Sequence, residues 1–177
     1  MSEIGKNYMN EEPKSTETKV KMTVYTALNK RKIYASRLTK LHETGASFIE
    51  CVLAVETKIN GIPREDLVNK LKSNYDKTID IIRNLYTLNA AITRSNALTE
   101  ITIGGETMTV TEALTRYDKI NTEIDLLNSI AKTVGSTHAD TIEERIEKLQ
   151  EFISEFNEAI NISNMQTEIE VCLVVDK

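Results

Sequence analysis

Histidines, cysteines and paired carboxylates are the residues of this chain whose types could do catalytic or metal chemistry. His42 and His138 stand at no metal-ligand spacing to Cys, Asp or Glu, and the helical Glu-x-x-His of a di-iron bundle is absent. Cys51 and Cys172 each lie in an apolar run, which favours two buried thiols. The Glu-Glu pair at 143–144 suits the first turn of a helix. With no serine in a nucleophile elbow either, we expect no enzyme, no metal and no cofactor.

Arg31 is a second candidate, because it lies within the apolar stripe of an expected helix. One interpretation is structural: its stem lies along the stripe and its head stays in water. The other is that its guanidinium faces an anion or a carboxylate in a partly buried place, since a desolvated guanidinium needs a partner. Gly104-Gly105 is no alternative anion site, because it lacks the Lys-Ser/Thr of a phosphate-binding loop.

Composition restricts the fold and the partners. The chain has 177 residues, which is one domain's worth, and only six Gly, two Pro and 5% aromatic residues, which favours long helices. A net charge of −5 gives no general attraction to nucleic acid or anionic lipid. No apolar run is long enough to cross a bilayer, and there is no signal-peptide pattern. We expect no nucleic-acid partner, no membrane partner and a cytoplasmic location.

The first half of the chain is expected to contain an arm, two helices and a strand. Residues 1–19 are polar and predict a disordered arm, or one that orders on assembly. Apolar residues at helical spacing predict a first helix over 23–43 and a long central helix over 63–96, on which Ile82 belongs to the packing face. The apolar, partly β-branched run at 47–55 predicts a strand between them.

The second half predicts a hairpin, two helices and a strand. Residues 99–110 alternate around Gly104-Gly105, which is typical of a β-hairpin, and Thr109 with Glu112 forms a capping box at the start of the third helix. A fourth helix follows from residue 140, and the tail at 167–175 predicts a strand paired with 48–55 or with another subunit. The fold class is mainly α: one domain over 20–177, a bundle of about four long helices with a small β-hairpin and peripheral strands.

Four segments, in order over residues 27–168, resemble one protein family. Ile92-Thr93-Arg94-Ser95-Asn96 is similar to its Ile-Asn-Arg-Thr-Asn, and residues 105–118 to its Gly-x-Thr-Leu-Thr-Glu-Ala-Leu-Ala-Arg-Arg-Asp. Residues 156–168 are similar to its closing Leu-Asp-x-x-Ile-Gln-x-x-Asn-Trp-Thr-Thr-Glu, with Met165 in place of the Trp, and Ala27-Leu28 ahead of the first arginines fits its opening. The chain thus resembles the septicolysin-like family of small helical bacterial and phage proteins, whose activity is unassigned.

The resemblance singles out polar residues at the ends of elements as a candidate ligand site. Its members are Arg31, Arg37, Arg94, Asn96, Arg116, Asp118 and Asn164. Arginine forks suit phosphate groups, so several of them converging at a subunit interface would hold a small anionic, nucleotide-like ligand. The expected function is therefore that of a non-enzymatic homo-oligomer that sequesters such a ligand, for example a phage anti-defence sponge in the host cytoplasm.

The competing interpretation is a structural or protein-interaction scaffold that has no small-molecule ligand. In it the same polar residues cap helices and form ion pairs between helices or between subunits, such as Arg94 or Arg116 with Asp118. The N-terminal arm and the strand-like tail would then tie subunits or a partner protein together.

Overall fold

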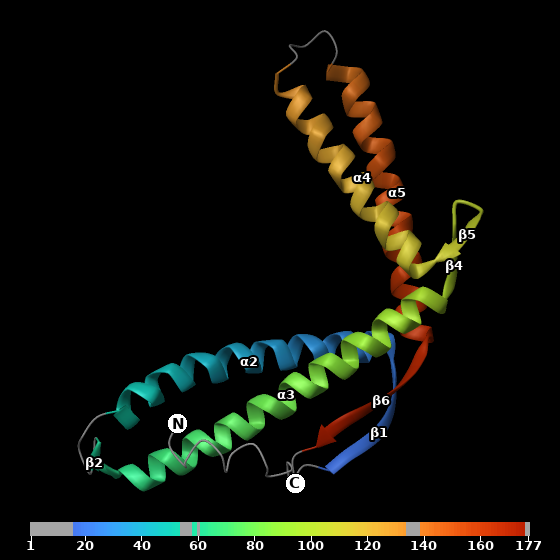
Figure 1. The fold of residues 1–177 in the computed structure, drawn as a ribbon. Coiled ribbons are helices and arrows are strands. Elements are labelled where there is room, and N and C mark those ends of the chain that lie inside the picture. Colours follow the sequence, from blue (N-terminus) through green and yellow to red (C-terminus); the bar gives the residue numbers. More distant parts are fainter. Residues whose placement is uncertain (1–15, 54–57, 60, 134–138, 176–177) are drawn as a thin grey trace, which may run out of the picture. The chain divides into compact units, whose positions relative to one another are not determined.

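The computed structural model describes residues 16–53, 58–59, 61–133 and 139–175, and over these residues the chain is mainly helical, as predicted (Figure 1). Four helices occur in this part: α2 (Val24–Leu53), α3 (Arg64–Leu98), α4 (Val110–Ala131) and α5 (Ala139–Gln166). Its strands pair two by two, and they are β1 (Thr16–Thr23), β2 (Lys58–Ile59), β3 (Ile62–Pro63), β4 (Glu100–Ile103), β5 (Glu106–Thr109) and β6 (Glu168–Val175).

The chain divides into two compact units. Unit 1 consists of Met1–Val20, Asn29–Asn89 and Glu170–Lys177, and unit 2 of Lys21–Leu28 and Ala90–Ile169. The helices α2 and α3 and the strands β1 and β6 each contribute to both units. The single domain expected over residues 20–177 stays a prediction.

In unit 1 the central helix α3 buries one face. Leu67 and Leu88 lie in the core of this unit, together with Asn84 and with Val171 and Leu173 of β6. The sequence placed Ile82 on the same face, but its side chain is 46% exposed. Ile81 is half-buried on the packed face of the helix, and Ile82 lies about 100° further around the axis. Its side chain therefore projects away from that face.

Strand β1 lies where the sequence predicted the end of a disordered arm. Residues 16–19 and Lys21 are exposed, Val20 is half-buried and Met22 is buried, so the second half of the strand has the period-2 alternation of a half-buried strand. Residues 1–15 of the predicted arm lie outside the described residues.

The predicted tail strand is confirmed as β6, and its partner is β1 rather than residues 48–55. Lys19 Nζ contacts Glu170 at 3.2 Å, and the Val24 N–H donates to the Thr167 carbonyl at 2.9 Å. From Lys19 to Val24 the residue number rises, while that of the partner falls from Glu170 to Thr167, so the two strands run antiparallel. The hydrogen bond to Glu170 raises the pKa of the exposed Lys19.

The strand predicted over 47–55 is wrong, because α2 continues through Gly45 to Leu53. Extending a helix that already has twenty residues adds one hydrogen bond per residue fixed, whereas starting a new strand requires a partner. A glycine inside the helix costs only about 1 kcal/mol. Of residues 47–53, only Ile49 and Val52 are β-branched, which is too few to outweigh that continuation. Residues 54–55 lie outside the described part.

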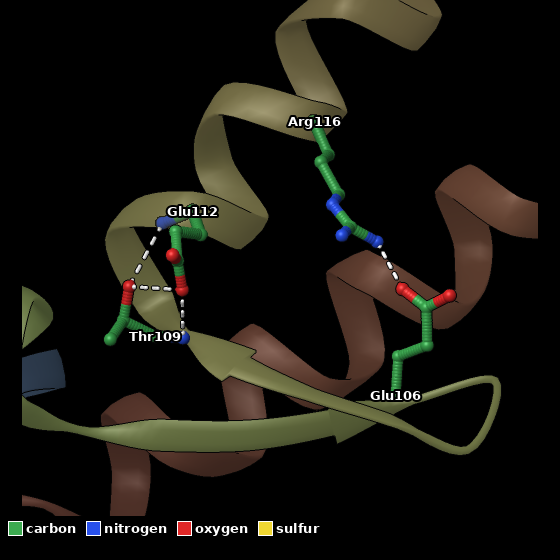
Figure 2. A network of polar contacts seen from close by, with 4 residues as sticks. All are labelled: Glu106, Thr109, Glu112 and Arg116. Atoms are coloured by element: carbon green, nitrogen blue, oxygen red, sulfur yellow. Dashed lines mark hydrogen bonds and ion pairs between the residues drawn. The ribbon is translucent and has the colours of Figure 1, made fainter.

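In unit 2 the predicted hairpin and capping box are both confirmed. Strands β4 and β5 pair antiparallel around Gly104 and Gly105, whose φ angles of +58° and +83° suit glycine in a tight turn. The Glu112 N–H donates to Thr109 Oγ1 at 3.2 Å, and the Thr109 N–H donates back to Glu112 Oε2 at 2.8 Å (Figure 2). The core below them is formed by Ile103, Met108, Ala113 and Phe156.

Candidate functional site

An open pocket of about 510 Å³ lies between α2, α3 and β6, within unit 1. Its volume falls within the range of small-molecule sites, roughly 300–1,000 Å³. The lining combines basic, aromatic and aliphatic side chains: Tyr34, Arg37, Lys40, Leu41, Lys77, Asp80, Ile81, Asn84, Val174 and Val175. We call this the α2–α3–β6 pocket.

One face of α2 forms the first wall. Tyr34, Arg37 and Leu41 recur at steps of three and four residues, so they project to the same side of the helix. Tyr34 and Leu41 are half-buried, whereas Arg37 is exposed. The helix therefore offers an aromatic ring and an aliphatic surface with a guanidinium beside them.

The second wall is held in place by Asn84 of α3. Asn84 is buried and bonds both polar groups of Val174: its Nδ2 donates to the Val174 carbonyl at 3.0 Å, and its Oδ1 accepts from the Val174 N–H at 2.7 Å. The amide thus replaces a neighbouring strand for this residue of β6. Because of these two bonds, Val174 and Val175 form a fixed apolar side of the pocket.

Positive charge predominates in the pocket. Arg37, Lys40 and Lys77 contribute three positive charges and Asp80 one negative charge, which leaves a net of two positive charges in a chain of net charge −5. Lys40 and Asp80 each already have an interaction within the molecule. Over the described residues, the side chains of Arg37 and Lys77 form no hydrogen bond or ion pair. Two cations are therefore available to an anion.

Of the seven residues predicted as a ligand site, one lines this pocket, namely Arg37. Arg31 belongs to the same unit and is exposed, so it is not the partly buried guanidinium that one interpretation required. The other five belong to unit 2, where Asn96 and Asn164 are half-buried and Arg94, Arg116 and Asp118 are exposed. Their convergence across a subunit interface stays a prediction.

Within the chain, Arg116 pairs with a residue other than Asp118, and a pair between subunits stays a prediction. Arg116 of α4 instead contacts the carboxylate of Glu106 on β5 (Figure 2). Residues two apart on a helix point to different sides, so Arg116 and Asp118 do not face each other. Both members of the observed pair are more than half exposed, so it contributes little to stability.

Lys40, Lys77, Asn84 and Val174 were not among the predicted site residues. The signal for Asn84 was present, because an amide between Ile81 and Leu88 in an apolar helical row must find buried partners. For the two lysines the sequence has no such signal, since lysines on a charged helix face are usually solvated.

Neither cysteine is among the residues found to line this pocket. Cys172 is exposed, because it lies on the opposite side of β6 from the buried Val171 and Leu173, which corrects the prediction of a buried thiol. The side chain of Cys51 lies outside the described part. In the described ranges, no group of His, Cys, Asp and Glu could hold a metal ion, and no helix has the length and apolarity that crossing a membrane requires.

No protein-family model and no curated protein matches the chain, so the septicolysin-like resemblance stays a prediction. Among solved structures, the fold is similar to that of a functionally unknown conserved protein from Corynebacterium diphtheriae. The TM-score is 0.60 at 19% sequence identity, and the match covers 85% of this chain and 99% of the other. At that identity the similarity concerns the fold alone.

Proposed function

We propose that this chain is a non-enzymatic protein that binds a small anionic, nucleotide-like ligand in the α2–α3–β6 pocket. The observation that carries the proposal is that Arg37 and Lys77, whose side chains pair with nothing among the described residues, line the same pocket as Tyr34. Phosphate oxygens suit the two cations, and an aromatic base suits the tyrosine ring and the aliphatic walls.

Sequestration is the role that this arrangement supports. The pocket offers cations, a ring and apolar walls, but no cluster of catalytic groups from which we can assemble a reaction. A protein that binds without turnover lowers the free concentration of its ligand in proportion to its own amount. The septicolysin-like family that the chain resembles includes phage proteins. The proposal therefore extends to a cytoplasmic protein that sequesters a nucleotide signal of the host.

The test uses native mass spectrometry and calorimetric titration of the full chain with ADP, adenosine and inorganic phosphate. We expect ADP to bind more tightly than either fragment, because only ADP engages both the cations and the ring. Native mass spectrometry of protein purified gently from its host then weighs any retained ligand. Failure of all three probes to bind, together with an empty protein from the host, would refute the proposal.

Variants of the two basic residues locate the site. Arg37→Ala and Lys77→Ala should each weaken ADP binding by roughly ten- to a hundredfold, since a hydrogen bond to a charged group contributes about 1.5–3 kcal/mol. Arg31→Ala is the matched control: it removes an exposed arginine of the same helix that lies outside the pocket. An equal loss in all three variants would mean general charge attraction instead of a site.

A scaffold without a ligand is the second candidate. The observation that favours it is the strong exposure of Tyr75 and Tyr86, at 66% and 77%, because exposed aromatic residues are typical of protein interfaces. It predicts an empty protein in every titration above.

A further inference from the structure

A row of apolar side chains on α3 stays largely exposed in the part of unit 1 that the structure describes. Tyr75, Ile79, Ile82 and Tyr86 follow one another at steps of four, three and four residues and span about 16 Å of the helix. Tyr75 is 66% exposed, Ile82 46% and Tyr86 77%, while Ile79 is half-buried. A contiguous apolar surface of this kind marks an interaction site on a soluble protein. We call it the α3 stripe.

The α3 stripe is separate from the α2–α3–β6 pocket. The pocket residues of this helix are Lys77, Asp80, Ile81 and Asn84. At 100° per residue, the centre of that group lies about half a turn around the axis from the centre of the stripe. A partner seated on the stripe therefore leaves the pocket open.

The spacing of the stripe is the same in both directions. Steps of four, three and four residues are those of the apolar positions in paired helices. Since the series is palindromic, two copies of α3 that run in opposite directions place Tyr75 opposite Tyr86 and Ile79 opposite Ile82. Each large ring then meets a ring, and each isoleucine meets an isoleucine.

The charges beside the stripe match this antiparallel arrangement. Asp76 directly follows Tyr75 in the sequence, and Arg83 directly follows Ile82. Both charged residues therefore lie along the same edge of the stripe, and both are exposed. They are about 10 Å apart along the axis, too far to pair with each other. In the described part of the chain, neither side chain has an ion-pair or hydrogen-bond partner. In the antiparallel pair, Asp76 of each copy faces Arg83 of the other, so two ion pairs form by symmetry.

We propose that α3 pairs with α3 of a second copy in an antiparallel, twofold homodimer, with the α3 stripe at its centre and the Asp76–Arg83 pairs at its rim. An apolar, aromatic centre with a charged rim is the usual composition of such an interface. The proposal goes beyond the ligand-binding function and does not depend on it.

Sedimentation of the full chain over a concentration series tests the apolar part. We expect a dimer that Ile82→Ser weakens by roughly tenfold or more. Ile33→Ser is the matched control, because Ile33 is 51% exposed on α2 and lies outside the stripe. Both isoleucines are exposed, so both variants should keep the wild-type circular dichroism and melting temperature. A chain that is monomeric at every concentration, or an equal effect of the two substitutions, would overturn the proposal. The stripe would then be a binding surface for a different protein.

Charge reversal tests the register. Asp76→Arg and Arg83→Asp should each weaken the dimer, since each places like charges opposite one another twice. The double variant should dimerise as the wild type does, and an equimolar mixture of the two single variants should form heterodimers. Recovery in neither the double variant nor the mixture would overturn the antiparallel pairing, even if the chain is dimeric.

Discussion

At the scale of single residues, Asn84 is the side chain on which the geometry of the pocket depends most directly. Its amide satisfies the N–H and the carbonyl of Val174, and all these groups are buried. We expect Asn84→Ala to lower the free energy of unfolding by about 1–3 kcal/mol, because it leaves two buried backbone groups without partners. Urea denaturation measures the loss, and faster amide exchange at Val174 localises it.

The control for that prediction is Asn89→Ala, which removes an exposed amide from the same helix. It should leave both the unfolding curve and the exchange of Val174 unchanged. If the two variants lose the same stability, or if Val174 keeps its protection in Asn84→Ala, the amide does not hold β6.

Sequence reasoning found part of the pocket, and the missing part has a physical reason. Arg37 was predicted, because it belongs to the polar set that the family resemblance singled out. Lys77 was not, since its role depends on α2 and β6 lying beside it, and that is a matter of tertiary packing. Asn84 could have been found from its apolar neighbours in the helical row.

At the scale of elements, local signals decided which predictions succeeded. The hairpin at residues 99–110 is specified by two glycines and by Thr109 with Glu112, all within a few residues of one another. The run at 47–55 has apolar content without a strand partner, and the helix preceding it continued. Strand β1 shows the opposite error: its alternation was visible, but its charged composition was taken as disorder.

The start of α4 leads to a pH-dependent prediction. The hydrogen bond from the Thr109 backbone N–H, aided by the one from its hydroxyl, lowers the pKa of the Glu112 carboxyl. The folded chain therefore binds this proton more weakly than the unfolded chain does. The stabilisation is fully present above the ordinary glutamate pKa, and it is lost as the pH falls through the lowered folded-state pKa.

Comparison with Glu112→Gln isolates this effect. The variant should be less stable than the wild type at neutral pH, and the difference should vanish in acid, as urea unfolding followed by circular dichroism at several pH values would show. Glu100→Gln, at an exposed position of β4, serves as the control. A difference that persists unchanged in acid would mean that the charge of Glu112 has no part in the cap.

At the scale of the whole molecule, the two proposals use opposite sides of one helix. The pocket takes its residues from one face of α3, and the α3 stripe lies about half a turn away. Both lie in unit 1, so neither depends on how the two units are arranged. Sites without shared side chains usually contribute to the free energy additively.

We therefore expect ligand binding and dimerisation to be independent. Ile82→Ser should shift the dimer equilibrium and leave the ADP affinity within about twofold of the wild type, whereas Arg37→Ala should do the reverse. The double variant should show both effects, each at the size found in the single variant, when titration and sedimentation are done on the same preparations. If monomeric Ile82→Ser instead loses ADP binding, the ligand site requires the second copy, as the sequence-based hypothesis of a site at a subunit interface proposed. The dimer would then be part of the binding site, because affinity would depend on protein concentration.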